Sequence, residues 1–366
     1  LHPDILRANP FGAADGIYGL NRTAGYNCLN YAKKSVSIDL QTPEGVELAK
    51  RIIMISDVVT DSFAYGVMQR YGLDYEELKK LKPELVVMSK STMGHMGRER
   101  HLFGWGTAVI SYAGLASVTG YGPGDEPRMV GGTWPDYVVG IYSAFALLSA
   151  IYNSKKTGEG VFIDNSMAEG VISMMPEAVL EYTMNGRVTA PRANRDERMA
   201  PNGVYRCQGD DKWVAISVSN NQEWEALCQT TGHSEWLKDD RFVDLYSRQR
   251  HYKELDALIT EWTKPRTNME VTESLQRAGV AAGPCYTAVD VCYDPHLRER
   301  GQFVEMDHPE VGPRMMPTMP VHLSALPDIE YQRSPLLGEH NDYVFSELLK
   351  MSQEEIGQLV EEGVIR

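Results

Sequence analysis

Asp57-Val58-Val59-Thr60 and Leu85-Val86-Val87-Met88 are two short apolar runs that decide the fold class of this chain. An amphipathic helical pattern precedes the first run and opens at Thr42-Pro43-Glu44, with Thr42 as the cap and Pro43 in the first turn. Residues 35–40 fit an earlier strand, so the order is strand, helix, strand, helix, strand. This order predicts a parallel sheet covered by helices, with ligands bound beyond the carboxyl ends of the strands.

The bulk composition predicts one large domain and a smaller one in 366 residues. A net charge of -14 argues against a nucleic-acid partner or an anionic membrane, because both require a basic face. The five cysteines are scattered without a C-x-x-C pair, which favours the reducing cytoplasm over a disulfide framework or a metal site. The apolar stretch 138–152 is too short to span a bilayer, so no membrane partner is expected.

The pattern changes near Gly203. Residues 204–207 and 212–218 form a predicted hairpin, and helical patterns follow it. This part is predicted to be a smaller α+β domain, and the tail rich in Pro and Met crosses back to close on a helix at 341–350. Upstream, single helices are predicted at 107–119, 137–153 and 167–182.

Asp136 stands where an irregular stretch rich in Gly and Pro becomes a long apolar helix. An aspartate in that place is most often the N-cap of the helix. The free N–H groups of a helix start also bind or stabilise negative charge. Capping and chemistry therefore both remain open for Asp136 on its local sequence alone.

Several pieces of the chain, taken in order, together resemble one family. They are the stretch from Asn30 to Gly45, the run 57–66, Gly140 after Asp136, the stretch 156–166, and Met199-Ala200-Pro201-Asn202-Gly203-Val204-Tyr205. In this order and spacing the chain resembles the family III CoA-transferases, the relatives of formyl-CoA, crotonobetainyl-CoA and benzylsuccinate CoA-transferases.

The resemblance implies an α/β fold with a Rossmann-like large domain, built from residues 1–190 and 305–366. A small α+β domain, residues 191–304, is inserted between them. The family forms an interlocked dimer, so a homodimer or a heterodimer with a homologous subunit is expected. The family also begins with a strand-loop-helix unit that has no counterpart before Leu1. Either the sequence lacks that unit, or a partner chain completes the site.

The resemblance identifies Asp136 as the catalytic aspartate, which would attack an acyl-CoA and carry CoA as an aspartyl thioester. Lys33 and Lys34 become candidates for the CoA phosphates, Ser62 and Phe63 for the turn that contacts the cofactor, and Arg70 for the nucleotide end. The lysines also fit a solvated strand start, Arg70 a helix surface and Phe63 a core aromatic. CoA thioesters are expected as substrates, with no metal and no permanently bound cofactor.

The acceptor acid is predicted from three further side chains. Trp105 and Tyr137 suggest a roomy apolar acyl pocket, although core positions explain them equally. Arg195 lies in a charged loop and could hold a substrate carboxylate, against the alternative of a solvated loop. By analogy with benzylsuccinate CoA-transferases, we expect succinyl-CoA as donor and a dicarboxylic acid as acceptor, with aryl-substituted acids such as benzylsuccinate among the candidates.

Two alternatives stay open. A 2-methylacyl-CoA racemase of similar fold would use a His-Asp pair in the loop before Thr107, where this chain has neither residue, although His101 lies nearby. His95 and His101 are otherwise assigned to a solvated loop. The second alternative is a non-catalytic subunit of a hetero-oligomeric CoA-transferase, against which the presence of Asp136 argues.

Overall fold

The computed structural model of the chain describes residues 4–8, 12, 14–131, 133–327 and 329–366, so Leu1 and Gly132 lie outside the described residues. The chain splits into two compact units. Unit 1 comprises Leu1–Val109, Thr133–Ser173 and Asp294–Arg366, and unit 2 comprises Ile110–Gly132 and Met174–Tyr293. The division at residues 190 and 305 remains a prediction.

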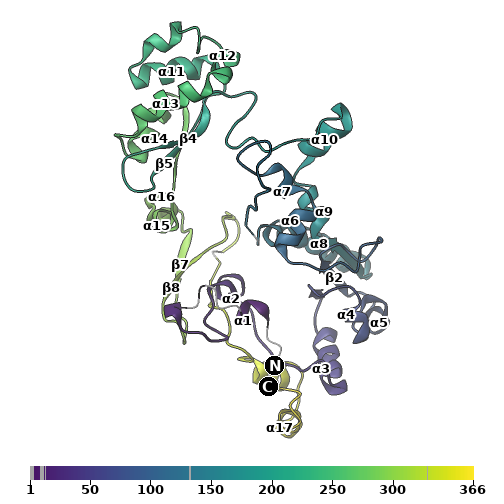
Figure 1. Cartoon of the computed structure of the whole chain (residues 1–366). Helices are drawn as coiled ribbons and strands as arrows, with labels where there is room; N and C mark the ends of the chain where they lie inside the picture. The colour runs from purple at the N-terminus through teal and green to yellow at the C-terminus, as the bar shows by residue number, and fades with distance from the viewer. Residues whose placement is uncertain (1–3, 9–11, 13, 132, 328) are drawn as a thin grey trace. The chain divides into compact units, whose positions relative to one another are not determined.

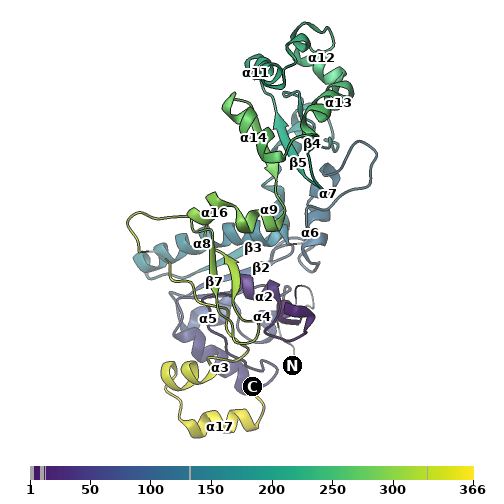
Figure 2. The same cartoon turned by 90° about the vertical axis from the view of Figure 1, so that its left-hand side faces the viewer.

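Unit 1 contains a parallel three-stranded sheet, which confirms the predicted α/β class (Figure 2). Its strands β1 (Val58–Asp61), β2 (Val86–Ser91) and β3 (Val161–Ser166) follow one another in that order across the sheet. The expected strand at residues 35–40 is wrong. That segment makes only an isolated bridge between Ile38 and Ile365. Its backbone N–H groups donate instead to backbone and side-chain oxygens of the C-terminal segment, such as the Val364 carbonyl and the Asn341 side chain.

Three helices cover one face of this sheet: α3 (Pro43–Met54), α4 (Val67–Arg70) and α5 (Tyr75–Leu81). The Thr42 hydroxyl accepts a hydrogen bond from the Gly45 N–H at 3.0 Å, which confirms the predicted cap of α3. The core between helices and sheet consists of buried apolar side chains: Ile53, Met68, Leu73, Leu78, Leu85 and Val87. Burial of this apolar stripe holds the helices on the sheet.

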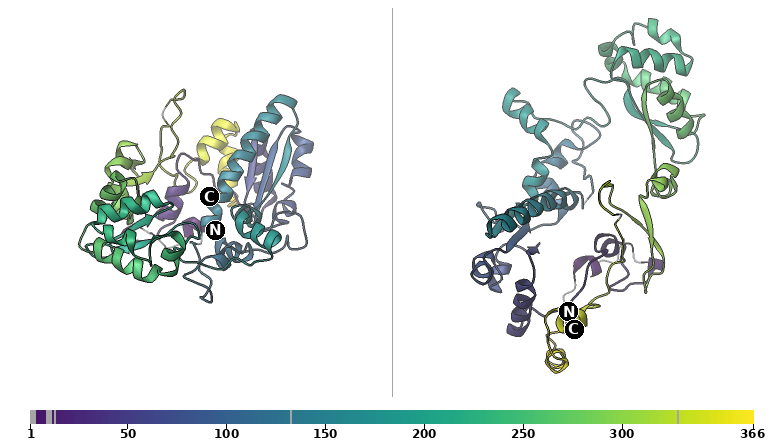
Figure 3. Two further views of the ribbon diagram at one scale, coloured as in Figure 1. Left: turned by 90° about the horizontal axis from the view of Figure 1, so that it is seen from above. Right: turned by 180° about the vertical axis from the view of Figure 1, so that it is seen from behind.

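The long helix α8 (Trp134–Thr157) packs against β2 and β3, as does the short helix α9 (Met167–Ile172) against α8 and β3 (Figure 3). The Ser154 hydroxyl donates to the Glu84 carbonyl at 2.6 Å, and Asn165 donates through Nδ2 to the Ser143 hydroxyl at 2.8 Å. These bonds tie the C-terminal part of α8 to the residues just before β2, and the middle of α8 to β3. The helix is therefore one layer of unit 1.

With 24 residues, α8 is longer than the predicted stretch 138–152, because it begins at Trp134-Pro135 and continues through Lys155 and Lys156. Among the described residues it is the one helix whose length and composition would allow it to cross a membrane, which corrects the expectation that no run is long enough. A single helix of this kind is weak evidence for a span. One face of α8 is already occupied by the sheet.

The rest of unit 1 gathers around its N- and C-terminal segments. The Arg7 guanidinium is buried over the Tyr26 ring at 3.6 Å and donates to the Pro335 carbonyl at 3.1 Å, which joins segments distant in sequence. In place of the expected helix at 341–350 there is a π-helical turn at Tyr343–Leu348. The other elements are α1 (Ile5–Ala8), η1 (Ala14–Gly16), α2 (Ala24–Leu29), α16 (Pro295–Glu299), β7 (Phe303–Met306), β8 (Arg314–Pro317), η3 (Tyr343–Leu348) and α17 (Gln353–Glu361).

Two helices predicted as continuous are each broken. The stretch 107–119 forms α6 (Gly106–Tyr112) and α7 (Leu115–Val118), because Gly114 between them has φ 86°, outside the helical region. The stretch 167–182 forms α9 and α10 (Pro176–Asn185), because Pro176 cannot continue a helix and begins a new one.

Unit 2 is built on an antiparallel sheet with helices packed on it (Figure 1). The predicted hairpin is confirmed as β4 (Asn202–Arg206) and β5 (Trp213–Ser217), and β6 (Ala281–Cys285), which was not predicted, adds a third strand. The helices of unit 2 that follow β5 are α11 (Asn221–Thr231), η2 (Ser234–Lys238), α12 (Leu245–Arg250), α13 (Tyr252–Thr263), α14 (Asn268–Arg277) and α15 (Ala288–Tyr293).

Arg248 is the largest fully buried side chain of unit 2, and we expect its loss to loosen that unit selectively. Its guanidinium donates to the Ala200 carbonyl at 2.8 Å and the Phe242 carbonyl at 3.2 Å. Arg248→Met leaves both carbonyls buried without partners and should cost about 2 kcal/mol. Amide exchange in unit 2 should then speed up about 30-fold.

The matched control is Arg250→Met, because Arg250 is exposed on the same helix. Hydrogen exchange read by mass spectrometry should distinguish the two variants peptide by peptide. Equal exchange in both variants would show that the buried guanidinium contributes nothing to the stability of unit 2.

Candidate functional site

Polar side chains collect at the carboxyl ends of the three parallel strands. In register across the sheet, Asp61 pairs with Ser89 and Ser89 with Asp164, and one step further Lys90 pairs with Asn165. Successive side chains of a strand point to opposite faces. Asp61, Ser89 and Asp164 therefore belong to the face covered by α4 and α5, and Lys90 and Asn165 to the face covered by α8.

Asp136 lies in the first turn of α8, as the third residue of the helix. The alternative that Asp136 is the N-cap residue is therefore wrong. The helix begins earlier, at Trp134, because Pro135 is preorganised for the first helical turn, and Thr133 takes the cap position. The carboxylate remains at the positive end of the helix dipole, which favours its charged form.

The charge state of Asp136 is set by two opposing effects. Although its side chain keeps contact with solvent, surrounding protein atoms displace part of its water and raise the pKa of the carboxyl group. The positive charge of Lys90 acts in the opposite direction and lowers this pKa. Lys90 was not singled out from the sequence. The available signal was a lysine within an otherwise buried strand.

Lys33 and Lys34 both line a cavity of about 670 Å³, together with Arg7 and Arg366. The Lys33 ammonium donates to the Asn30 side chain at 3.0 Å, and the Lys34 ammonium lies over the Tyr343 ring at 5.0 Å. Burial lowers the pKa of Lys33, and the charge of Lys90 lowers it further. The Lys90 charge thus acts on both Lys33 and Asp136.

The predicted cofactor turn follows β1. The Phe63 N–H donates to the Asp61 carboxylate at 3.0 Å, while the Phe63 ring stays 46% exposed, so it is no core aromatic in this chain. Ser62 is exposed beside it, and Arg70, exposed, ends α4. Ser62 and Phe63 directly follow the carboxyl end of β1, the edge at which ligands of such sheets bind.

The predicted acyl-pocket residues differ in their surroundings. Tyr137 follows Asp136 on α8, and Trp105 directly precedes α6; their side chains are 54% and 73% exposed, respectively. Arg195 belongs to unit 2, where it forms an ion pair with Asp256 and lies over the Tyr252 ring at 4.0 Å. Its guanidinium therefore already has protein partners.

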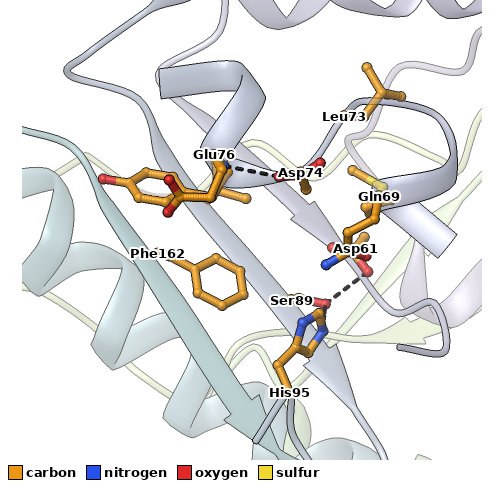
Figure 4. A pocket seen from close by; sticks show the side chains of 11 residues that line it. Asp61, Gln69, Leu73, Asp74, Glu76, Ser89, His95 and Phe162 are labelled. Carbon is orange, nitrogen blue, oxygen red and sulfur yellow. Dashed lines mark hydrogen bonds between the residues drawn. The ribbon is translucent and has the colours of Figure 1, made fainter. Parts of the chain in front are cut away.

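A second polar cluster occupies the opposite face of the sheet and lines a pocket of about 290 Å³ (Figure 4). The Ser89 hydroxyl lies 3.0 Å from the Asp61 carboxylate and 2.7 Å from Nε2 of His95. The backbone N–H of His95 donates to the Asp164 carboxylate at 2.8 Å. The assignment of His95 to a solvated loop is therefore wrong. The reason is the turn at Gly94, with φ 80°, which folds the loop over the strand ends.

His101 is also engaged, because its ring meets the Tyr65 ring edge-on at 5.0 Å between centroids. Burial raises the pKa of Asp61 in the neighbouring cluster. Among the described residues, no group of three or more His, Cys, Asp or Glu side chains is placed to hold a metal ion.

Comparison with known proteins gives a consistent result. The family model described as CoA-transferase family III matches residues 2–341. The succinyl-CoA–D-citramalate CoA-transferase of Chloroflexus aurantiacus is 30% identical, over 99% of this chain and 91% of that protein. The succinyl-CoA–L-malate CoA-transferase beta subunit of the same organism is 29% identical, over 91% and 82%. A formyl-CoA:oxalate CoA-transferase of Rhodopseudomonas palustris is 26% identical, over 93% and 84%.

Solved structures agree in fold. A CAIB/BAIF family protein from Brucella suis superposes with a TM-score of 0.82 at 29% identity, covering 94% of this chain and 89% of the other. A hypothetical protein from Mycobacterium tuberculosis gives a TM-score of 0.73 at 23% identity, covering 87% and 85%, which shows the fold alone.

Proposed function

The chain belongs to CoA-transferase family III and is an enzyme of that kind, and from this we propose that it moves CoA from succinyl-CoA to a second carboxylic acid through Asp136. The observation that carries the proposal is the place of Asp136. Its carboxylate stands at the start of α8, close enough to the carboxyl end of β2 for the charge of Lys90 to act on it. A partly desolvated carboxylate in such a place can attack a thioester carbonyl.

In the proposed reaction, a carboxylate oxygen of Asp136 attacks the thioester carbonyl carbon of the donor. The C–S bond breaks, and a mixed anhydride and CoA thiolate result. The thiolate then attacks the aspartyl carbonyl carbon, so the donor acid leaves as a carboxylate and Asp136 carries CoA as a thioester. The acceptor carboxylate repeats these steps in reverse order. No proton is transferred, and the thioester free energy is retained.

The positive end of the α8 dipole is the proposed source of oxyanion stabilisation, because Pro135 has no N–H and the Asp136 N–H already donates to the Thr133 carbonyl at 3.1 Å. For CoA itself, we propose that Lys33 and Lys34 bind its phosphates in the cavity that they line together with Arg7 and Arg366, and with Asp4 and Asp39. Ser62, Phe63 and Arg70 would contact the nucleotide from the loop and helix after β1. The exposure of the Phe63 ring supports this role, because an exposed aromatic face is available to stack on adenine.

For the acceptor we propose a short dicarboxylic acid. The names of three relatives mention citramalate, malate and oxalate, which are all short dicarboxylates. Trp105 and Tyr137 would line the acyl pocket. Benzylsuccinate, with its aryl group, remains a prediction, as does carboxylate binding by Arg195, because Asp256 already pairs with that guanidinium.

One acceptor panel tests the proposal. The purified enzyme is incubated with succinyl-CoA and, separately, citramalate, malate, oxalate or benzylsuccinate, and the new acyl-CoA is measured by mass spectrometry. We expect transfer to at least one of these acids. Failure with every dicarboxylate would refute the assignment of the acceptor.

Incubation of a 2-methylacyl-CoA in deuterated water tests the racemase alternative, since α-deuteration without CoA transfer would favour it. A chain inactive until a homologous subunit is added would favour the non-catalytic role.

We further propose that the enzyme works as a dimer with a second copy of this chain. The support is an apolar stripe on α8 formed by Ile141, Phe145, Leu148 and Tyr152, which are each between 69% and 74% exposed in the single chain. Spacings of four, three and four residues place them on one face of the helix. A contiguous exposed apolar face of this kind supports an interaction surface.

The cytoplasmic location remains a prediction. It rests on the cysteines, because all five carry free thiols, as is usual in a reducing compartment.

Phe145→Glu should weaken this dimer at least about 100-fold, because it would bury an unpaired charge in the contact. Light scattering coupled to size-exclusion chromatography, run over a dilution series, measures the effect. Tyr246→Glu is the matched control, since Tyr246 is an aromatic residue of unit 2 with 67% exposure. An unchanged dimer in Phe145→Glu would exclude the α8 stripe as the interface.

A further inference from the structure

Lys90 is the charged residue of strand β2, the fifth of its six residues. It pairs in register with Asn165 of β3, and residues paired in a parallel sheet have side chains on the same face. Asn165 shows which face this is, because its amide donates to the Ser143 hydroxyl of α8 at 2.8 Å. The Lys90 side chain therefore leaves the sheet on the side of α8.

Asp136 belongs to the same face of that helix. Ser143 lies seven residues after Asp136 and Val139 three residues after it, which are spacings that repeat one face of an α-helix. Val139 is fully buried under this face, and its carbonyl accepts the Ser143 hydroxyl at 2.7 Å. The face that carries Asp136 is thus turned toward the ends of β2 and β3, where Lys90 stands.

The electrostatics agree with this geometry. The Lys90 charge lowers the pKa of Asp136, against the effect of burial, and it also lowers the pKa of Lys33. Within the described part of the chain, the half-buried Lys90 ammonium has no hydrogen bond or close ion pair of its own. A cation in this position is available to an anion beside Asp136.

We propose that Lys90 is a substrate-binding residue of this enzyme: its ammonium holds the carboxylate of the acceptor acid against the aspartyl-CoA thioester. The inference rests on the proposed function. In the free enzyme the Asp136 carboxylate is the anion beside Lys90. Once Asp136 carries CoA, its carbonyl is neutral, and the acceptor carboxylate takes that place.

The step remains balanced with Lys90 protonated throughout. The acceptor oxygen held by Lys90 forms a C–O bond to the aspartyl carbonyl carbon, the C–S bond breaks, and its electron pair leaves on the CoA sulfur. The thiolate then attacks the acyl carbon of the acceptor. The anhydride C–O bond breaks, and the electron pair returns to the Asp136 carboxylate beside Lys90. One ammonium therefore faces a carboxylate both before and after the transfer.

The test separates binding of the acceptor from formation of the thioester. Wild-type enzyme, Lys90→Met, Lys90→Arg and the exposed control Lys238→Met are first loaded with succinyl-CoA, and the free succinate is removed. Loss of the aspartyl-CoA adduct is then followed at increasing concentration of the acceptor found in the panel. Hydroxylamine serves as a second nucleophile because it carries no carboxylate.

We expect Lys90→Met still to form the aspartyl-CoA adduct and to need about 10- to 100-fold more acceptor for half-saturation, since a charge-assisted bond is lost. Lys90→Arg should stay within about fivefold of wild type, and cleavage by hydroxylamine should be unchanged in all variants. An unchanged half-saturation in Lys90→Met overturns the proposal, as does an equal loss of reactivity toward hydroxylamine. Failure of either Lys90 variant to load would place Lys90 in the donor step or the fold, and also overturns it. If wild-type Asp136 itself never carries CoA, the proposed function fails first.

Discussion

Asp136→Asn should lose CoA transfer by a factor of about 1,000 or more, because an amide cannot attack the thioester and no other nucleophile replaces the covalent step. Asp136→Ala should be equally inactive, which removes deamidation of the asparagine as a source of residual activity. The measurement is acyl-CoA formation from succinyl-CoA with the best acceptor of the panel. Hydroxylamine trapping followed by peptide mass spectrometry should mark Asp136 in the wild-type enzyme alone.

Two further variants sharpen this result. Asp136→Glu keeps the carboxylate but moves it by one methylene, so it should retain a small, measurable activity. Asp240→Asn, an exposed aspartate of unit 2, should behave like wild type. A hydroxamate found at another residue, or substantial transfer by Asp136→Ala, would contradict the aspartyl mechanism.

Gly160→Ala should destabilise the sheet of unit 1 by about 3–5 kcal/mol, the range of severe packing defects. A Cβ atom at Gly160 would stand 2.1 Å from the Leu85 carbonyl oxygen, at the start of the pairing between β2 and β3. Backbone cannot give way as a flexible side chain can. The strands must separate there, and urea unfolding followed by circular dichroism should show the loss.

The control for this variant is Gly357→Ala. Gly357 lies within helix α17, and a Cβ added there meets no atom within 4 Å. Since alanine is the better helix former, this change should be neutral or should stabilise by up to about 1 kcal/mol. If the two variants unfolded alike, the close approach of Gly160 to Leu85 would not be a determinant of the fold.

Local sequence was sufficient for the central strands and for the predicted nucleophile. β1, β2 and β3 follow from short apolar runs bounded by polar residues, and the hairpin of β4 and β5 from two such runs around a turn. Asp136 was singled out because motifs in a fixed order surround it. Its predicted position just before the helix was wrong. The helix already begins at Trp134, because Pro135 favours the first helical turn.

Long-range contacts decided what the sequence pattern could not. Residues 35–40 have the composition of a strand, yet their hydrogen-bond partners lie about 300 residues later, in the C-terminal segment. The sequence around His95 is typical of a solvated loop, but the turn at Gly94 places the His95 ring within hydrogen-bonding distance of Ser89. In both cases the local pattern was compatible with two environments, and a distant partner selected one.

By itself, the sequence determined that the chain forms a parallel α/β sheet, that it belongs among the CoA-transferases, and that Asp136 is its candidate nucleophile. Only the tertiary structure decided that Lys90 stands on the Asp136 side of the sheet while Ser89, its neighbour in the chain, serves the opposite pocket. The physical reason is that the sequence fixes which side chains of a strand share a face, because they alternate along the strand. Which site each face lines depends on the helices that pack on it. That packing joins β2 to α8 across more than 40 residues of chain.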